Sequence, residues 1–193
     1  SNFLLAWRAL IRQHRQPGKP MQPIKVRAEV AGDFNAIDVV NLSAFQGEAE
    51  AQLVGNLRKS PVFIPDLSLV AELNGRIVGH VVLSKVKLMS SEGETEILAL
   101  GPMSVVPSQS HRGIGSELID AAVARAKPLC YTAIVVAGHP EYYERFGFKP
   151  AADWGISCNL SIPSDALTAM ELVDGSLASG GEVQYPDIFR ALF

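Results

Sequence analysis

Residues 105–115 decide the fold, and they read Val-Val-Pro-Ser-Gln-Ser-His-Arg-Gly-Ile-Gly. The segment leaves an apolar strand, is stopped by a proline and turns directly into a helix. The first amides of a helix have no acceptor within it, and the helix dipole adds roughly half a positive charge there. Gly113 and Gly115 keep side chains away from these amides, while His111 and Arg112 add positive character. The turn is therefore a candidate site for a diphosphate.

Two widespread phosphate-binding loops do not fit this turn. A Walker loop needs lysine followed by serine or threonine after its second glycine, and Ser116-Glu117 stand there instead. A dinucleotide fingerprint needs a third glycine, whose place is taken by Leu118. The turn does contain a shorter pattern, Gly-x-Gly, at residues 113–115. Taken alone, Gly-x-Gly also fits a turn that only starts a helix.

Regular elements precede the turn. Residues 24–30 alternate between apolar and polar, as in a half-buried strand. Asp33 is the expected cap of a first helix, and a second helix ends near residue 59. Two strands follow over residues 67–73 and 76–86, joined by an Asn-Gly pair that is typical of a tight hairpin.

A polar connection over residues 88–94 is expected to lead to a third long strand over 95–106. Gly101 and Pro102 lie in the middle of that strand and predict a bulge or a splay, because proline donates no ladder hydrogen bond. A helix over 114–127 and an apolar run over 131–137 follow. This strand-helix-strand crossover predicts that the two strands lie parallel, and the apolar run indicates a strand buried on both faces.

The chain beyond the apolar run predicts a short helix that Gly147 closes, then one or two strands, one of them over 169–173. The element order is strand, two helices, three antiparallel strands, helix, strand, helix and terminal strands. It predicts a mixed α/β (α+β) fold in which one twisted, mostly antiparallel sheet is flanked by helices.

Composition limits the function classes. Apolar residues make up 48% and charged residues 19% of the 193 residues, which suffices for one domain with a core. The net charge of −3 argues against binding nucleic acid or a membrane surface through bulk charge. No apolar run approaches the roughly 18 residues of a membrane span. Two cysteines give neither a disulfide framework nor metal-ligand spacing, so we expect a reduced, cytoplasmic chain without a metal.

The first 23 residues are expected to be an N-terminal extension to a single domain over residues 24–193. Residues 1–16 mix arginines with apolar side chains, as in an amphipathic helix and unlike a signal peptide. A linker rich in proline and glycine follows. The apolar side chains of the extension suit a partner surface, which makes a homodimer possible.

Four stretches outside the turn carry a family resemblance. They are residues 78–81 (Val-Gly-His-Val), 100–105 (Leu-Gly-Pro-Met-Ser-Val), 138–148 (Gly-His-Pro-Glu-Tyr-Tyr-Glu-Arg-Phe-Gly-Phe) and 183–185 (Val-Gln-Tyr). With them, and with the element order, the chain resembles the YhbS-like branch of the GCN5-related N-acetyltransferases (GNAT). The resemblance implies the GNAT acyl-CoA N-acyltransferase fold, splayed between two parallel strands, and acetyl-CoA as co-substrate.

The resemblance also assigns cofactor contacts. The exposed edge beyond the splay would pair with the pantetheine arm through the backbone of Met103, Val105 and Val106. The pyrophosphate would lie on the turn formed by Ser110, His111, Arg112, Gly113, Ile114, Gly115 and Ser116. One position departs from the family, since Ser110 stands where glutamine or arginine is usual. Because the phosphate contacts are mainly backbone amides, we expect binding to survive with altered side-chain help.

Tyr143 matches the family's general acid, four residues before the glycine that closes the short helix. A phenol with an ordinary pKa of about 10 is protonated at neutral pH and can supply the proton that a departing thiolate needs. The competing interpretation is a packing residue. Three groups, Glu48, Glu96 and His139, or a chain of waters, are candidates for the base, and none is preferred. His80, on an apolar strand, is expected to be structural.

The sequence thus predicts an N-acetyltransferase that moves the acetyl group of acetyl-CoA to a primary amine of a small molecule or protein by direct attack. The alternative is a non-catalytic acyl-CoA-binding regulatory module. The departure from the family pattern at Ser110 and the apolar extension leave room for this alternative. The acceptor is unidentified. Loops over residues 46–50 and 88–94 and the C-terminal segment are expected to shape its site.

Overall fold

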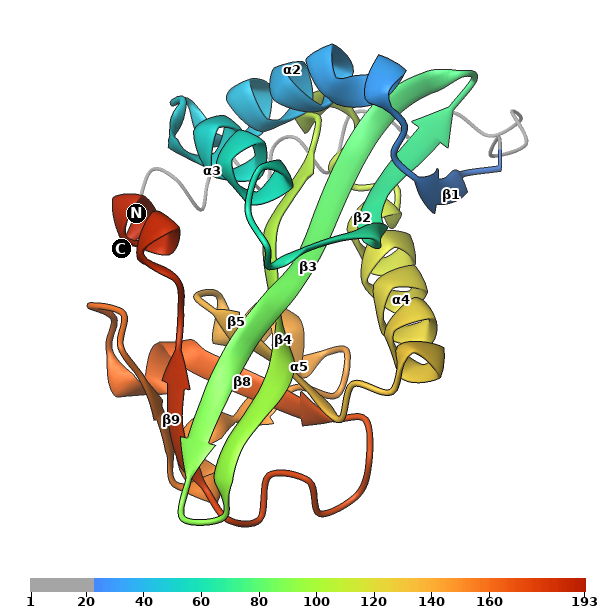
Figure 1. Cartoon of the computed structure of the whole chain (residues 1–193). Helices are drawn as coiled ribbons and strands as arrows, with labels where there is room; N and C mark the ends of the chain where they lie inside the picture. The colour runs from blue at the N-terminus through green and yellow to red at the C-terminus, as the bar shows by residue number, and fades with distance from the viewer. Residues whose placement is uncertain (1–22) are drawn as a thin grey trace, which may run out of the picture.

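The computed structural model describes residues 23–193, which share one mixed sheet of nine strands (Figure 1). The strands are β1 (Lys25–Ala28), β2 (Phe63–Leu73), β3 (Arg76–Ser90), β4 (Gly93–Val105), β5 (Ala133–Ala137), β6 (Lys149–Pro150), β7 (Ile156–Cys158), β8 (Leu167–Glu171) and β9 (Gly181–Gln184). They follow the order β1-β2-β3-β4-β5-β8-β6, and β9 pairs with both β3 and β7. The N-terminal helix expected over 1–16, and all of its linker but Pro23, lie outside the described residues.

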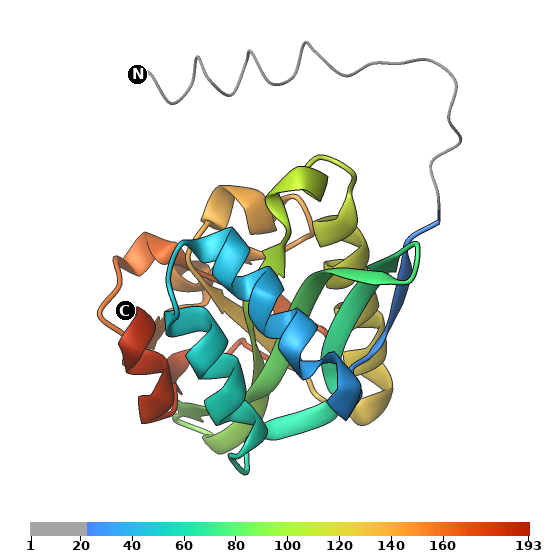
Figure 2. The ribbon, with the colours of Figure 1, turned by 90° about the horizontal axis from the view of Figure 1, so that it is seen from above.

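Helices cover both faces of the sheet, with α2 and α3 on one side and α4 on the other (Figure 2). The α-helices are α2 (Phe34–Phe45), α3 (Ala49–Arg58), α4 (Ile114–Ala126) and α5 (Pro140–Glu144). Short 3-10 helices are η1 (Ala31–Asp33), η2 (Pro107–Gln109), η3 (Lys127–Leu129), η4 (Ala151–Trp154), η5 (Ser164–Ala166) and η6 (Asp187–Leu192).

The alternation of side chains along β3 builds two cores. Val82 and Val86 join the core under α2 and α3, whereas Val81 and Leu83 join the core under α4 and α5. Successive side chains of a strand point to opposite faces, so one long strand serves both layers. The mixed fold predicted from the element order is therefore confirmed.

The predicted Asn-Gly hairpin is confirmed, and the next connection is shorter than expected. Leu73 pairs with Arg76 across the turn, and both turn residues have positive φ. The polar connection expected over 88–94 is instead mostly ladder, because β3 and β4 stay paired as far as Ser90 and Gly93. Polar side chains there mark an exposed strand face rather than a loop.

The splay predicted at Gly101 and Pro102 is confirmed. Parallel pairing of β4 with β5 is confined to residues 98–100 on β4, opposite 134–136 on β5. The register between β3 and β4 shifts at this level, and the Gly101-Pro102 peptide bond is cis. Beyond residue 100, β4 continues to Val105 on β3 alone, so the sheet opens between β4 and β5 (Figure 1).

Other local expectations need correction. The position of Cys130 just before the apolar run predicts a buried, inert thiol, but Cys130 is exposed. The chain from Trp154 onward, expected to hold one or two strands, holds β7, β8 and β9, and β6 precedes it. Strands β6 and β7 span only two and three residues. Segments that short give no readable periodicity. Asp33 precedes α2 but does not cap it with its side chain.

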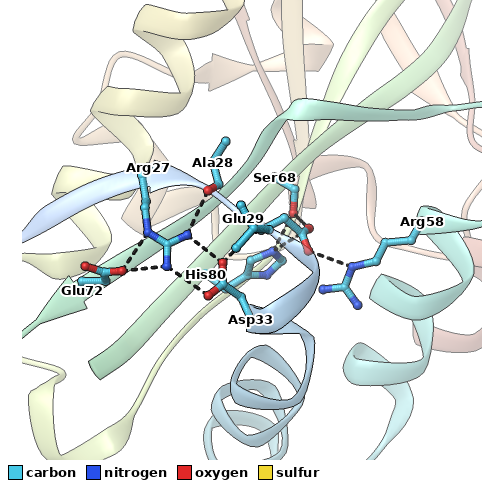
Figure 3. A network of polar contacts seen from close by, with 9 residues as sticks. Arg27, Ala28, Glu29, Asp33, Arg58, Ser68, Glu72 and His80 are labelled. Carbon is cyan, nitrogen blue, oxygen red and sulfur yellow. Dashed lines mark hydrogen bonds and ion pairs between the residues drawn. The ribbon is translucent and has the colours of Figure 1, made fainter. Parts of the chain in front are cut away.

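Asp33 belongs to an ionic cluster that joins β1, η1 and β2. Its carboxylate accepts a hydrogen bond from the Val30 amide at 2.8 Å and pairs with Arg27 at 2.6 Å. Arg27 also pairs with Glu72 on β2 at 2.6 Å. The hydrogen bond from Arg27 holds the pKa of Asp33 below its usual value. The cluster ties η1 to strands β1 and β2 (Figure 3).

A second, more deeply buried network lies beside it (Figure 3). Arg58, at the end of α3, donates from Nε to a carboxylate oxygen of Glu29 at 2.9 Å. Ser68 donates its hydroxyl to the other oxygen of Glu29. Nε2 of the completely buried His80 lies 2.9 Å from the same hydroxyl. Because that hydroxyl donates its proton to Glu29, Nε2 is the donor in this contact. The histidine is structural, as expected.

The burial of His80 predicts a pH dependence of stability. Desolvation, with help from the charge of Arg58, lowers the pKa of His80 from 6.5 to about 3. The unfolded chain therefore binds a proton below pH 6.5, whereas the folded chain binds it only near pH 3. Stability is lost as the pH decreases through this window. We expect the free energy of unfolding to drop by about 2 kcal/mol between pH 7 and pH 5 from this group alone.

Urea denaturation at pH 7, 6 and 5 checks this expectation. The variant His80→Gln removes the titrating group and should show a shallower loss of stability over the same range, whatever its stability at pH 7. Equal slopes for the variant and the wild type would contradict the assignment.

Candidate active site

The predicted anion site is the N-terminus of α4. Gly113 adopts a left-handed conformation with φ of 74°, which directs the chain from the turn into the helix. The first intrahelical hydrogen bond runs from the amide of Glu117 to the carbonyl of Gly113 at 3.1 Å. The amides of Ile114, Gly115 and Ser116 precede it and have no acceptor within the helix. They are available to an anion.

The turn before the helix is held by its own hydrogen bonds. The Ser110 hydroxyl donates to the carbonyl of Pro107 at 2.9 Å, and the Arg112 amide donates to the carbonyl of Gln109 at 3.3 Å. The Ser110 side chain therefore serves the turn rather than pointing away from it. Ser110, His111 and Arg112 are all exposed on this surface.

Gly115 brings three elements close together. A Cβ at this position would overlap the hydroxyl oxygen of Tyr142 from α5 and would lie 3.6 Å from Cε of Met103 on β4. The start of α4, the splayed end of β4 and α5 thus converge here. The close approach of the Tyr142 hydroxyl, and not the backbone conformation, favours glycine at this position.

A cleft with a volume of about 510 Å³ lies where the sheet opens. One wall comes from the splayed strands, the turn after β5 and helix α5, through Leu100, Gly101, Pro102, Met103, Val136, Ala137, Gly138, His139, Tyr142 and Tyr143. The opposite wall comes from α2, α3 and the C-terminal segment, through Phe45, Glu50, Leu53, Tyr185, Phe189, Leu192 and Phe193. Such a volume is typical of small-molecule sites.

Tyr143 lines this cleft and is almost fully buried, at 7% exposure. Its ring packs edge-on against Tyr142 and Phe148, with centroids 5.2 and 5.8 Å away. Burial, with a smaller contribution from Tyr142, raises the pKa of Tyr143 above its ordinary value. The phenol is therefore fully protonated at neutral pH and can act as a proton donor.

Tyr142, its neighbour, is half-buried and points toward Gly115. The guanidinium of Arg145 lies over its ring at 5.5 Å. Burial also raises the pKa of Tyr142. The two tyrosines therefore face different parts of the site, as expected from their adjacent positions on a helix.

The structure separates the other predicted contacts by location. Met103 lies at both the cleft and the helix N-terminus. Val105 and Val106 continue toward the turn, paired with β3 through Gly79 and Val78, and do not line the cleft. Ile114 is 1% exposed, so only its amide faces the turn.

The three candidate bases are not brought together. His139 lines the cleft. Glu48 is exposed and bonds to Gln52 at 3.4 Å, and Glu96 lines a separate cavity of about 250 Å³. The tip of the β3–β4 hairpin, expected to shape the acceptor site, is not part of the cleft, because the extended ladder carries it to the far end of the sheet (Figure 1).

The aromatic wall from the C-terminal segment was not foreseen residue by residue. Tyr185 and Phe189 stack edge-on at 5.1 Å, four residues apart. Tyr185 is completely buried at its hydroxyl, which has no hydrogen-bond partner within residues 23–193, and the residue lines both cavities. The four-residue spacing of Tyr185 and Phe189 is compatible with one face of a helix, but a single pair is too little to predict one.

Two further observations concern the described part of the chain. Within residues 23–193, no group of three or more histidine, cysteine, aspartate or glutamate side chains is placed to hold a metal ion. In the same part of the chain, no helix is long and apolar enough to cross a membrane.

Comparison with known proteins identifies the family. A family model described as an acetyltransferase (GNAT) domain matches residues 65–150. The uncharacterized N-acetyltransferase YjhQ of Escherichia coli K12 is 31% identical over 134 residues, which cover 69% of this chain and 74% of YjhQ. The uncharacterized N-acetyltransferase YhbS of the same strain is 28% identical over 167 residues, covering 86% of this chain and 98% of YhbS. The chain belongs to the GNAT acetyltransferases.

Solved structures agree with this assignment. The crystal structure of YhbS from Escherichia coli in complex with CoA superposes with a TM-score of 0.82 at 27% identity, covering 90% of this chain and 96% of YhbS. A GNAT family acetyltransferase from Brucella melitensis in complex with acetyl-CoA superposes with a TM-score of 0.71 at 28% identity, covering 87% and 99% of the two chains. The GNAT fold predicted from the sequence is confirmed.

Proposed function

We propose that this protein transfers the acetyl group of acetyl-CoA to a primary amine. The observation that carries the proposal is one juxtaposition. The unpaired amides at the start of α4 lie beside the open edge of β4, which leads into a cleft lined by a buried, protonated tyrosine. The YhbS and Brucella relatives, whose crystal structures hold CoA and acetyl-CoA, support it.

The cofactor would occupy two connected places. Its pyrophosphate would accept hydrogen bonds from the turn and helix start, over residues 110–116. Its pantetheine arm would lie along β4 at Met103, Val105 and Val106, where β4 has no strand partner on the β5 side in the described residues. The thioester would then reach the cleft between the splayed strands.

The reaction would proceed by direct attack. The lone pair of the neutral amine attacks the thioester carbonyl, a carbon–nitrogen bond forms and the oxygen becomes an oxyanion. The tetrahedral intermediate then collapses, the carbon–sulfur bond breaks and the electron pair leaves on sulfur. The Tyr143 phenol donates a proton to that sulfur, and the nitrogen loses one proton to solvent. The products are an amide and free CoA thiol, and the phenol regains its proton from water.

Titration calorimetry with CoA tests the binding step. We expect CoA to bind, and we expect Gly115→Ala to weaken binding about tenfold, because the new methyl group must displace the Tyr142 hydroxyl beside the helix start. Gly55→Ala is the matched control. Gly55 lies in helix α3 with open space where the alanine methyl group would stand, so this variant should bind CoA like the wild type.

The absence of measurable CoA binding to the wild type would overturn the proposal. A different result distinguishes the alternative function. A regulatory module that only binds acyl-CoA would bind CoA tightly but release no thiol with any amine. The test includes this alternative because Ser110 departs from the family pattern and its hydroxyl bonds within the turn.

A further inference from the structure

The acceptor half of the cleft has an uneven chemistry. The wall opposite the splayed strands is apolar and largely aromatic, with Phe45, Leu53 and Phe189 among its members. Among the side chains that line the cleft, Glu50 carries the one carboxylate, and none is lysine or arginine. The side chains of the cleft therefore offer one carboxylate and several aromatic faces, whereas lysine and arginine are missing and the one imidazole, His139, lies on the opposite wall.

Glu50 is placed to present its charge to a ligand. It lies in the first turn of α3, where the helix dipole favours a carboxylate, and it is half-buried. Its carboxylate has no hydrogen-bond or ion-pair partner within residues 23–193. The carboxylate of Glu29, by contrast, pairs with Arg58 at the opposite end of α3. Burying an unpaired carboxylate is costly, so a cation is the ligand group that fits beside it.

We infer that the acceptor is a cationic amine carried on an apolar, aromatic body that has no carboxylate or phosphate of its own. This inference rests on the proposed acetyl transfer. The ammonium group lies beside Glu50 before it loses its proton, and the aromatic faces of the cleft add cation–π attraction. The apolar body packs against Phe45, Leu53 and Phe189.

The same features exclude two other kinds of amine. An amino acid would bring its carboxylate close to Glu50, where like charges repel and no lysine or arginine of the cleft compensates. A diamine would bring a second ammonium into the apolar wall, where its desolvation is not repaid by a second carboxylate. Selectivity therefore comes from what the cleft lacks as much as from what it holds.

Three probes differ in one property each. Phenethylamine has the expected ring and amine, phenylalanine adds a carboxylate to the same skeleton, and putrescine replaces the ring with a second amine. Initial rates of thiol release at saturating acetyl-CoA, with the acetylated amine identified by mass spectrometry, give kcat/KM for each. We expect phenethylamine to exceed both others by about tenfold or more.

The variant Glu50→Gln tests the role of the charge at nearly constant size. We expect its kcat/KM for phenethylamine to fall about tenfold, mainly through a higher KM, because a charged contact to the ammonium is lost. Its preference for phenethylamine over phenylalanine should shrink as well. Glu92→Gln makes the same change at the exposed tip of the β3–β4 hairpin and should behave like the wild type.

The outcomes separate the acceptor class from the reaction. Rates with phenylalanine or putrescine equal to those with phenethylamine would overturn the acceptor class and leave acetyl transfer intact. An unchanged KM in Glu50→Gln would also overturn it, provided that calorimetry shows normal CoA binding. No thiol release with any amine, in a protein that binds CoA, would overturn the proposed transfer and the acceptor class with it.

Discussion

Replacing Tyr143 with phenylalanine is expected to lower kcat by about 100-fold, the scale of a lost general acid, and to leave the Kd for CoA unchanged. The phenol is buried and its pKa is raised, so it holds its proton throughout the neutral range. Phenylalanine keeps the edge-on packing against Tyr142 and Phe148 but supplies no proton as charge develops on sulfur. The loss should therefore appear in the chemical step.

Single-turnover rates of thiol release and calorimetry with CoA measure the two quantities separately. Tyr131→Phe is the matched control, since Tyr131 is half-buried just before β5 and does not line the cleft. It should retain wild-type kcat. Wild-type turnover in Tyr143→Phe would refute the general-acid role. A parallel loss of CoA binding and melting temperature would instead indicate a packing role.

Replacing Arg58 with methionine is expected to lower the free energy of unfolding by about 3–5 kcal/mol, which is the scale for removing one partner of a buried ion pair. The carboxylate of Glu29, whose side chain is 4% exposed, would lose its 2.9 Å contact with the guanidinium. The hydroxyl of Ser68 would still donate to that carboxylate, but a neutral donor does not balance its charge. The stacking of Arg58 over Phe34 would be lost too.

Urea denaturation at pH 7 measures this loss. Lys87→Met is the control, because it breaks the exposed pair with Glu94 and should change stability by less than about 1 kcal/mol. The double variant Arg58→Met with Glu29→Gln should recover part of the stability, since the unpaired charge is gone. A single variant as stable as the wild type would show that the pair contributes nothing.

The sequence predicted the elements that have a periodic hydrophobic pattern and the turns that need a particular residue. Asn74-Gly75 placed a hairpin because both positions need positive φ, and Gly101-Pro102 placed the splay because proline leaves a ladder incomplete. The strands β6 and β7 were missed because two or three residues carry no period. The domain boundary near residue 23 and the possible homodimer stay predictions.

The site divides in the same way. The turn at 110–115 was readable because consecutive residues form it, and the contacts assigned to it stay predictions. Residues 46–50 and the C-terminal segment were expected to shape the acceptor site, and both contribute to the cleft. The particular residues Glu50 and Phe189 were not predicted, because 139 residues of chain separate them and the tertiary packing of α3 against η6 brings them together. Asp33 resembled a cap by its position, but the nearby guanidinium of Arg27 attracts its carboxylate more strongly.

Helix α3 has different duties at its two ends. Its last turn is anchored through Arg58 in the interior, whereas its first turn offers Glu50 to the cleft, about 12 Å away along the axis. With the proposed acceptor site, substitutions around residues 45–50 are expected to change which amines are accepted and to leave the Arg58 contact with Glu29 intact. Directed evolution of this enzyme toward new amines should begin there and leave the anchored end untouched.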